Sequence, residues 1–402
     1  MSMPLEGIRV LDLTQYAFGP RTAGFLAEMG AAVIKIENTQ GGDPVRGVLA
    51  LKGIPMYEGK FNAYFEQNHR GKRGIALDLH QEKGREVAYK LVEESDVFVT
   101  NLRIGSLERL GMDYETLSAL NPRLIYALGT GWGLRGAARD RGAFEATGFA
   151  RSGLVTSFAE PQLLPPQCPP GVGDYTAATF LAYGIMLALF HRERSGEGQM
   201  VHTSLLGSLM KIGSLCIDTS LAAGRDMVGV PHDAENAFYN CYQTKDKRWI
   251  QLAILQDERS WSEFCETMGI QHLENDPRFN TAEARVENRI ALIAILDELF
   301  ISKTHREWIE RLEEHKFAWA PVQYFTELDS DPQILENDYI LTLHDPEAGN
   351  VKAVGVGIDL SKTPGRIGGK APELGQHTEE VLLELGYTWD DIVAMKEQDV
   401  IL

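Results

Sequence analysis

The residue whose type and surroundings best suit covalent chemistry is Asp174, which follows the run Gly171–Gly173 and opens a long apolar stretch. An aspartate at the start of a helix is most often a cap, whose side chain accepts hydrogen bonds from the first free backbone N–H groups. The helix dipole also favours an ionised carboxylate there, and flanking glycines let a ligand approach closely. Such a carboxylate could act as a nucleophile. The residues alone leave both roles open.

The elements that would position Asp174 alternate between strand and helix. Short runs rich in Val, Ile and Leu predict strands at residues 8–13, 32–37, 74–78, 96–100 and 123–128. Apolar residues at helical spacing predict helices at residues 21–29, 82–94, 174–194 and 205–221. Strands separated by helices in this way indicate a parallel sheet that is covered on both faces.

The pattern changes after residues 222–225, which we interpret as a linker. Two strands are expected within residues 239–255, and helices at residues 258–268, 281–302 and 304–314. Beyond about residue 340 come short strands, glycine and proline breaks, and a last helix near residues 378–385. We therefore predict a large α/β domain over residues 1–221, a small α+β domain over 222–335, and a return to the large domain over 336–402.

Composition narrows the class of protein. The chain has 402 residues, 44% of them hydrophobic and 24% charged, which is typical of a globular protein of about two or three domains. Its 39 Lys and Arg stand against 57 Asp and Glu, a net charge of −18. This acidic balance argues against a nucleic-acid partner, because phosphate contacts need clustered Lys and Arg. The sequence contains no phosphate-binding P-loop, no G-x-S-x-G elbow and no metal-ligand cluster, so no tightly bound cofactor or metal is expected.

Sequence features also indicate a compartment. The four cysteines are scattered and lack C-x-x-C spacing, which is typical of buried thiols in a reducing environment. The first twenty residues lack the basic and apolar regions of a secretory signal. The apolar run Phe180–Phe190 has 11 residues, too few to span a bilayer, and predicts a buried helix. We expect a cytoplasmic protein without a membrane partner.

Several short stretches carry a resemblance when they are taken in order. They are Pro4–Thr14 with Gly19 and Pro20, Gly30–Glu37 with Gly42 and Asp43, Asn68–Arg73, Asn101 with Leu107–Gly111, Asn121–Tyr126, Ser195–Gln199 and Ala371–Thr378. Together they resemble the family III coenzyme A transferases, the group that contains formyl-CoA and carnitine CoA-transferases. The resemblance covers nearly the whole chain. It implies a discontinuous Rossmann-like large domain, a small α+β domain and an interlocked homodimer.

The resemblance also implies a role for Asp174. The pair Gly173-Asp174 occupies the place of the family's nucleophile, a role that is compatible with capping. Asp174 would form a mixed anhydride and then an enzyme-bound CoA thioester, and it would pass CoA from an acyl-CoA to a free acid without ATP. Coenzyme A thioester is then a substrate, and none of these steps needs a tightly bound cofactor. Glu145 matches an acidic or polar position near the reaction centre, and a buried structural carboxylate is an equal alternative for it.

Coenzyme A contacts carry over to further positions of this sequence. The loop Gln15, Tyr16, Ala17 and Phe18 resembles the stretch that lies against the CoA chain, and the resemblance makes Gln15 a candidate catalytic residue as well. Family positions for the phosphates and the adenosine end are matched by Lys72, Asn101, Leu102 and Arg109, although Lys72 and Arg109 could also be ordinary surface charges. Asn38 stands where some family members carry an arginine.

The substrate and two alternatives stay open. The stretches Phe149–Gly153 and Leu164–Pro170 resemble transferases for aryl or branched acids, such as phenyllactate, 2-hydroxyisocaproate or benzylsuccinate. A 2-methylacyl-CoA racemase shares the fold but needs a proton-transferring His where this chain has Phe144. A non-catalytic subunit of a hetero-oligomeric transferase is the other alternative. It is favoured by Asn38 and by residues 232–239 in place of a glycine-rich loop, and disfavoured by the retained Asp174.

Overall fold

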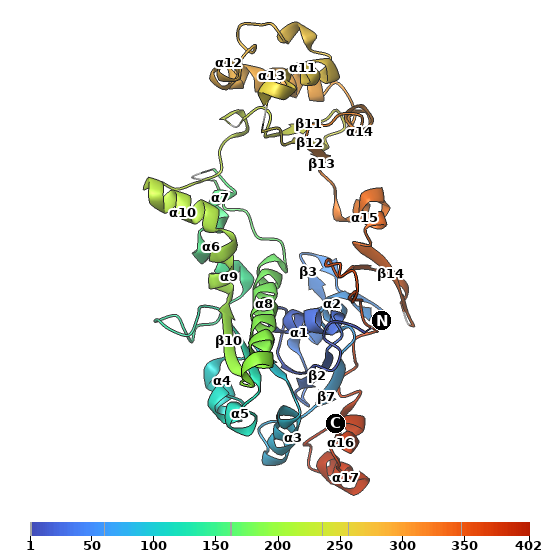
Figure 1. Cartoon of the computed structure of the whole chain (residues 1–402). Coiled ribbons are helices and arrows are strands. Elements are labelled where there is room, and N and C mark those ends of the chain that lie inside the picture. The colour runs from blue at the N-terminus through green and yellow to red at the C-terminus, as the bar shows by residue number, and fades with distance from the viewer. Residues whose placement is uncertain (1, 60, 161–162, 235, 256, 347) are drawn as a thin grey trace. The chain divides into compact units, whose positions relative to one another are not determined.

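The computed structural model describes residues 2–59, 61–160, 163–234, 236–255, 257–346 and 348–402 (Figure 1). The chain divides into two compact units. The first contains Met1–Val155, Pro166–Met227 and Pro332–Leu402, and the second contains Thr156–Pro165 and Val228–Asp331. The main part of the second unit covers residues 228–331, compared with the predicted range of 222–335. The unit also includes the segment Thr156–Pro165, which no sequence pattern predicted.

The first unit is built on a six-stranded sheet in the order β10-β9-β8-β1-β2-β7. Its strands are β1 (Arg9–Leu13), β2 (Ala32–Glu37), β7 (Arg73–Ala76), β8 (Val97–Thr100), β9 (Ile125–Thr130) and β10 (Gln199–Ser204). All neighbouring strands are parallel, which confirms the predicted parallel sheet. The edge strand β10 was not predicted, because its polar residues Gln199, His202 and Thr203 hide a strand that is only half-buried.

Helices cover both faces of this sheet. Successive residues of a strand point to opposite faces, so neighbouring residues pack against different helices. On one face Val10 packs in a cluster with residues of α1 (Phe18–Glu28) and α8 (Val172–Ser195). On the other face Leu11 packs with residues of α3 (Glu82–Glu93), α16 (Thr378–Glu384) and α17 (Trp389–Glu397). The C-terminal segment therefore returns to the core of the first unit, beside the label C in Figure 1.

Two predicted helices are each broken into two. The stretch 205–221 forms α9 (Leu205–Ile212) and α10 (Ser214–Ala223), which meet at Gly213. A Cβ on Gly213 would lie 2.5 Å from the Cδ2 atom of Leu154, so a larger residue here would have to displace that side chain. The stretch 281–302 forms α12 (Ala282–Glu287) and α13 (Arg289–Phe300) on either side of Asn288.

The second unit is a small α+β domain. Its antiparallel sheet has the order β11-β12-β13, formed by β11 (Cys241–Gln243), β12 (Trp249–Leu252) and β13 (Trp319–Pro321). The helices α11 (Asp257–Met268), α13 and α14 (His305–Leu312) contribute residues to its hydrophobic core. Strands β11 and β12 are the two strands that were expected within residues 239–255, whereas β13 was not predicted.

The remaining elements are short. They are η1 (Pro44–Gly47), β3 (Ala50–Leu51), β4 (Ile54–Pro55), β5 (Tyr57–Glu58), β6 (Phe61–Asn62), α2 (Ala63–His69), α4 (Ile104–Leu110), α5 (Tyr114–Leu120), α6 (Glu145–Ser152), α7 (Leu154–Ser157), η2 (His232–Ala234), η3 (Gln271–Leu273), η4 (Phe325–Ser330), α15 (Pro332–Glu336), β14 (Ile340–Asp345) and β15 (Gly349–Val354).

Helix α8 is long and apolar enough, by length and composition alone, to cross a membrane, and α9 with α10 would pass the same test as one bent pair. In this fold α8 instead packs against α1, β9 and β10. Its residues Ala177, Leu181 and Ile185 are fully buried in that core. We therefore interpret α8 as a core helix of the sheet.

Candidate active site

The first turn of α8 is held by a carboxylate from another helix. The cap position is Gly171, which has a φ of 88° and no side chain to accept a hydrogen bond. Glu145, the first residue of α6, supplies the acceptor: its Oε1 lies 2.8 Å from the Gly171 nitrogen, and its Oε2 lies 3.0 Å from that of Gly173 and 3.4 Å from that of Asp174. Capping was one of the two roles that the residues left open for Asp174, and the structure does not show it: Asp174 lies inside the helix, and Glu145 accepts the hydrogen bonds of the free N–H groups.

The Asp174 carboxylate is free for chemistry. It lines a cavity of about 470 Å³, and no described residue donates a hydrogen bond to its oxygens. Burial raises the pKa of the Asp174 carboxyl to about 7, and the negative charge of Glu145 adds to the rise. A raised pKa means that the ionised form is poorly solvated, and such perturbed groups are concentrated at functional sites.

Glycine at position 173 is needed for this arrangement. A Cβ there would lie 2.9 Å from the Cβ of Glu145 and 3.0 Å from the ring of Phe149. Both distances are shorter than ordinary contacts, so α6 and the start of α8 can approach this closely only at a glycine. The Gly173-Asp174 pair therefore fixes where the carboxylate lies.

The cavity lies where loops leave the carboxyl ends of parallel strands, the usual position of ligand sites in open α/β sheets. Its lining residues are Gln15, Tyr16, Ala17 and Phe18 after β1, Asn101, Leu102, Arg103, Ile104 and Ser106 after β8, Gly129, Thr130 and Gly131 at the end of β9, Arg139–Phe144, Asp174 and Leu205. Aromatic and apolar groups thus stand beside three arginines and the Asp174 carboxylate.

A second cavity, of about 430 Å³, adjoins the carboxyl ends of β1, β2 and β7. It is lined by Leu13, Thr14, Gln15, Ile36, Glu37, Asn38, Thr39, Gln40, Gly42, Asp43, Leu77, Asp78, Leu79, His80, Leu102 and Leu110. Gln15 and Leu102 line both cavities. A long ligand that passes these two residues could occupy both.

Most predicted contact residues meet at these cavities. Gln15, Tyr16, Ala17, Phe18, Asn101 and Leu102 line the first cavity with Asp174, while Asn38 lines the second. Asn101 also holds the backbone of the loop after β1, because its Oδ1 accepts the Gln15 N–H at 2.8 Å and its Nδ2 donates to the Gln15 carbonyl at 2.8 Å.

Two predicted cationic contacts are not brought to either cavity. The ammonium of Lys72 is buried, 2.7 Å from Asp12 Oδ2 and 2.7 Å from the Pro20 carbonyl oxygen, and burial lowers its pKa to about 8. An ion pair inside the core thus replaces the expected phosphate contact of Lys72. Arg109 lies exposed on α4, where it donates to Ser106 Oγ at 3.0 Å and lies outside the lining of both cavities.

Sequence reasoning missed other residues of the site. Arg103, Arg139 and Arg141 line the first cavity. The clustering of three arginines within residues 135–141 was a usable signal for a basic segment. Tyr64, on α2, is also close: burial raises the pKa of its phenol, and the charge of Asp174 contributes to the rise. Within the described ranges, no group of three or more His, Cys, Asp or Glu side chains has the geometry of a metal site.

Comparison with known proteins places the chain. Residues 5–378 match the model of CoA-transferase family III. An acyl-CoA transferase of Fusarium pseudograminearum is 33% identical over 99% of this chain and 88% of its own length. The (R)-2-hydroxy-4-methylpentanoate CoA-transferase of Clostridioides difficile is 30% identical over 99% of this chain and all of its own length. The crystal structure of a CaiB/BaiF family protein from Brucella suis superposes with a TM-score of 0.84 at 27% identity, covering 96% of this chain and 100% of that one. The chain belongs to CoA-transferase family III and is a CoA-transferase.

Proposed function

We propose that this enzyme moves CoA from an acyl-CoA thioester to a free carboxylic acid through covalent intermediates on Asp174. The observation that carries the proposal is the poorly solvated Asp174 carboxylate, which lines a cavity of about 470 Å³ at the start of α8. A buried carboxylate that is poorly solvated is a better nucleophile than a hydrated one, because less solvation is lost when it attacks.

The reaction balances as a series of acyl exchanges. An Asp174 oxygen attacks the donor thioester carbonyl, the C–S bond breaks, and CoA thiolate leaves a mixed anhydride. The thiolate attacks the Asp174 carbonyl carbon, which releases the donor acid and forms an aspartyl-CoA thioester. The acceptor carboxylate attacks that thioester and expels the thiolate again. The thiolate then attacks the acceptor's acyl carbon, which forms the new acyl-CoA and restores Asp174. Over the whole cycle one thioester bond is replaced by another of similar energy, so no ATP is consumed.

The cavities provide places for both substrates. We assign the chain of CoA to the first cavity along Tyr16–Phe18, and its adenosine end to the second cavity past Gln15 and Leu102. Asn38 would offer that end an amide rather than a cation. Arg103, Arg139 and Arg141 suit the phosphates or the acid, because guanidinium groups bind such anions in a bidentate manner.

For the acceptor we propose a medium-sized acid with an aryl or branched side chain, such as phenyllactate or benzylsuccinate. Phe18, Ile104, Phe144 and Leu205 give the first cavity an apolar surface that suits such a group. One relative, from Clostridium sporogenes, is named cinnamoyl-CoA:phenyllactate CoA-transferase, with 29% identity over 99% of this chain and 97% of its own length. Faster transfer to oxalate or formate than to phenyl-substituted acids would contradict this assignment.

We propose that the working form is a homodimer. Tyr183, Leu187 and Phe190 lie on one side of α8 and are 61%, 51% and 64% exposed in the single chain. A helix that is apolar on all sides is normally buried on all sides. A hetero-oligomer is a second candidate, because matched relatives from Chloroflexus aurantiacus are named as alpha and beta subunits of a succinyl-CoA–L-malate CoA-transferase.

The test is intact-mass spectrometry of the pure chain after incubation with a panel of acyl-CoAs, followed by trapping with hydroxylamine or borohydride. We expect an adduct on Asp174 that is absent in Asp174→Ala. Asp140→Ala is the matched control, because Asp140 lines the same cavity but pairs with Arg139 at 3.5 Å, and the adduct should persist in this variant. Absence of an adduct with every donor, despite CoA binding, would contradict covalent catalysis by the single chain and favour the hetero-oligomer.

A further inference from the structure

The loop after β1 has an unusual backbone conformation. Tyr16 has a φ of 66°, in the left-handed region that residues with a side chain rarely adopt. This conformation is strained for a residue other than glycine, so the surroundings must hold it in place. Tyr16 lines the cavity that contains Asp174 and packs edge-on against the ring of Phe144, with the ring centroids 5.7 Å apart.

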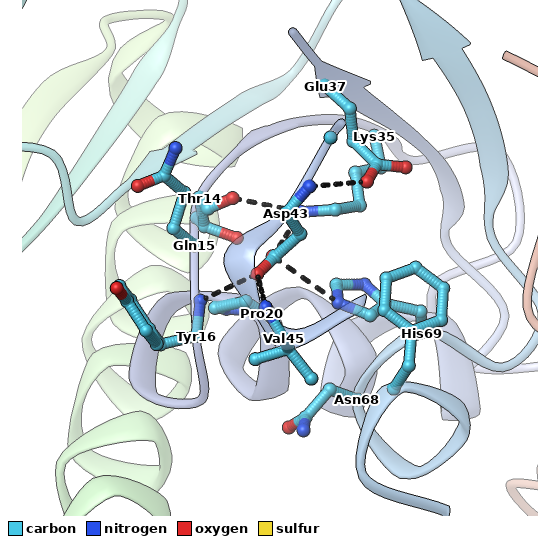
Figure 2. Close-up of polar contacts among 12 residues, drawn as sticks. Thr14, Gln15, Tyr16, Pro20, Lys35, Glu37, Asp43, Val45, Asn68 and His69 are labelled. Carbon is cyan, nitrogen blue, oxygen red and sulfur yellow. Dashed lines mark hydrogen bonds and ion pairs between the residues drawn. The ribbon is translucent and has the colours of Figure 1, made fainter. Parts of the chain in front are cut away.

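Side chains from three other parts of the first unit hold the backbone of this loop. Lys35 Nζ donates to the Thr14 carbonyl at 2.9 Å. The Asn101 amide binds both the N–H and the C=O of Gln15, as described above. The N–H of Tyr16 donates to Asp43 Oδ1 at 3.1 Å. Figure 2 shows Asp43 between the Tyr16 backbone and Lys35.

Lys35 and Asp43 form a buried ion pair beneath the loop. Their side chains are 0% exposed, and Nζ lies 3.1 Å from Oδ2. Burial alone would lower the pKa of Lys35, but Asp12 and Asp43 together raise it, so the ammonium stays charged. Burying two charges is expensive, and an apolar pair of similar volume often gives equal stability. Stability alone therefore does not account for this pair.

Asp43 is itself fixed from several sides. Its N–H donates to Glu37 Oε2 at 2.8 Å, and its Oδ1 also accepts the N–H of Val45 at 3.0 Å. His69 Nε2 lies 3.7 Å from its Oδ2, and burial holds the pKa of His69 well below its usual range, so that ring is neutral. Although Asp43 is part of the wall of the second cavity, its buried oxygens are directed to the loop and to Lys35.

We propose that Lys35 and Asp43 are positioning residues for CoA transfer, which hold Tyr16 in its left-handed conformation and so set the wall of the cavity around Asp174. The proposal rests on the function proposed above. Lys35 lies outside the lining of both cavities, and Asp43, in the wall of the second, directs its carboxylate oxygens to the loop and to Lys35. We therefore expect both to act through the backbone of Thr14 and Tyr16. A fixed cavity wall is important for the reaction because small displacements of the groups around a reacting centre lower the rate by a large factor.

The first test is Asp43→Asn, which keeps the size of the side chain and removes its charge. At saturating acyl-CoA, well below the melting temperature of the variant, we expect the rate constant for labelling Asp174 to fall about tenfold or more. A merely structural role would lower the melting temperature and leave that rate constant unchanged, and this result would overturn the proposal. Wild-type protein that is never labelled would instead contradict the proposed function.

Asp96→Asn is the matched control. Asp96 pairs with the buried Arg192 at 2.8 Å and accepts the N–H of Arg9 at 2.8 Å, so it resembles Asp43 chemically. It precedes β8, at the opposite end of the sheet from the loop, and lies outside the lining of both cavities. We expect this variant to lose thermal stability and keep its labelling rate within about twofold. An equal loss of rate in both variants would mean that the effect is not specific to the loop.

A second variant tests the role of the backbone. Glycine adopts positive φ without strain, so in a Tyr16→Gly background Asp43→Asn should reduce the labelling rate several-fold less than it does in the wild type. Independent effects of the two substitutions would contradict the proposal. If Asp43→Asn does not fold, hydrogen exchange of the wild-type protein provides the measurement: the Tyr16 amide should exchange as slowly as those of β1, and fast exchange would overturn the proposal.

Discussion

The protonation state of Asp174 should control the rate of the first chemical step. Its pKa of about 7 means that the carboxyl is mostly neutral below that pH and ionised above it. Only the ionised form attacks a thioester, so reactivity is lost as the pH falls through 7. Burial and the Glu145 carboxylate both contribute, and burial is the larger cause. Replacing Glu145 therefore separates the two causes.

The corresponding prediction concerns Glu145→Gln. Labelling of Asp174 in the wild type should increase with pH, with a midpoint near 7. In Glu145→Gln the midpoint should move to lower pH, because a nearby negative charge is lost, but it should stay above the value of a free aspartate because burial remains. Single-turnover labelling between pH 5 and 9 measures this. Glu108→Gln, a substitution of an exposed residue on α4, is the control and should leave the pH dependence of labelling unchanged. If the midpoint did not move in Glu145→Gln, Glu145 would not contribute to the raised pKa of Asp174.

At the residue scale, the glycines beside Asp174 made that carboxylate a candidate from residue types alone, whereas the loop Gln15–Phe18 was predicted only through the family resemblance. It could not predict that Glu145 caps α8, since acceptor and donors are 26 to 29 residues apart. For the same reason Lys72 was taken for a phosphate contact: its partner Asp12 is 60 residues away and becomes a neighbour only when β1 and β7 join one sheet.

At the scale of the elements, α6 can pack closely against the start of α8 because Gly173 has no side chain. We expect Gly173→Ala to lower the free energy of unfolding by about 1–3 kcal/mol, because its Cβ would overlap Glu145 and Phe149. The labelling rate should fall at least tenfold, since Asp174 is the next residue. Denaturant unfolding and single-turnover labelling measure the two effects.

Gly105→Ala is the control for this prediction. A Cβ on Gly105, in α4, would have only the guanidinium of Arg109 nearby, at 3.7 Å. Alanine is favoured over glycine in a helix by about 0.5–1 kcal/mol, so this variant should be as stable as the wild type or more stable, with an unchanged rate. If Gly173→Ala behaved in the same way, the close contact between α6 and α8 would not be needed for positioning.

The sheet strands were the most predictable elements, because β1, β2, β8 and β9 are short apolar runs that are buried on both faces. The ends and breaks of helices were less predictable. Gly213 and Asn288 divide helices that local periodicity predicts to be continuous. The described residues of the segment Thr156–Pro165 belong to the second unit, an assignment that no local sequence pattern predicts.

At the scale of the whole molecule, the exposed apolar side of α8 predicts self-association. Light scattering should give a mass of twice 44.7 kDa. Leu187→Glu should shift the protein toward the monomer, because a charge would then lie in a buried interface. Val393→Glu, which changes a comparably exposed apolar residue on α17 (52% against 51%), should leave the mass unchanged. A monomeric wild type at micromolar concentration would contradict the homodimer.

Helix α8 carries Asp174, the proposed nucleophile, at one end of its 24 residues, a length of about 36 Å at 1.5 Å per residue. Ala177, Leu181 and Ile185 are fully buried along it, and at the far end Arg192 binds Asp96. A carboxylate on a buried helix that is held at both ends cannot move between successive reaction partners. In the mechanism that we propose, Asp174 reacts with the donor, the thiolate and the acceptor in turn. We therefore expect the flexible arm of CoA to be the part that moves, and the rate at which it moves away and returns to limit turnover.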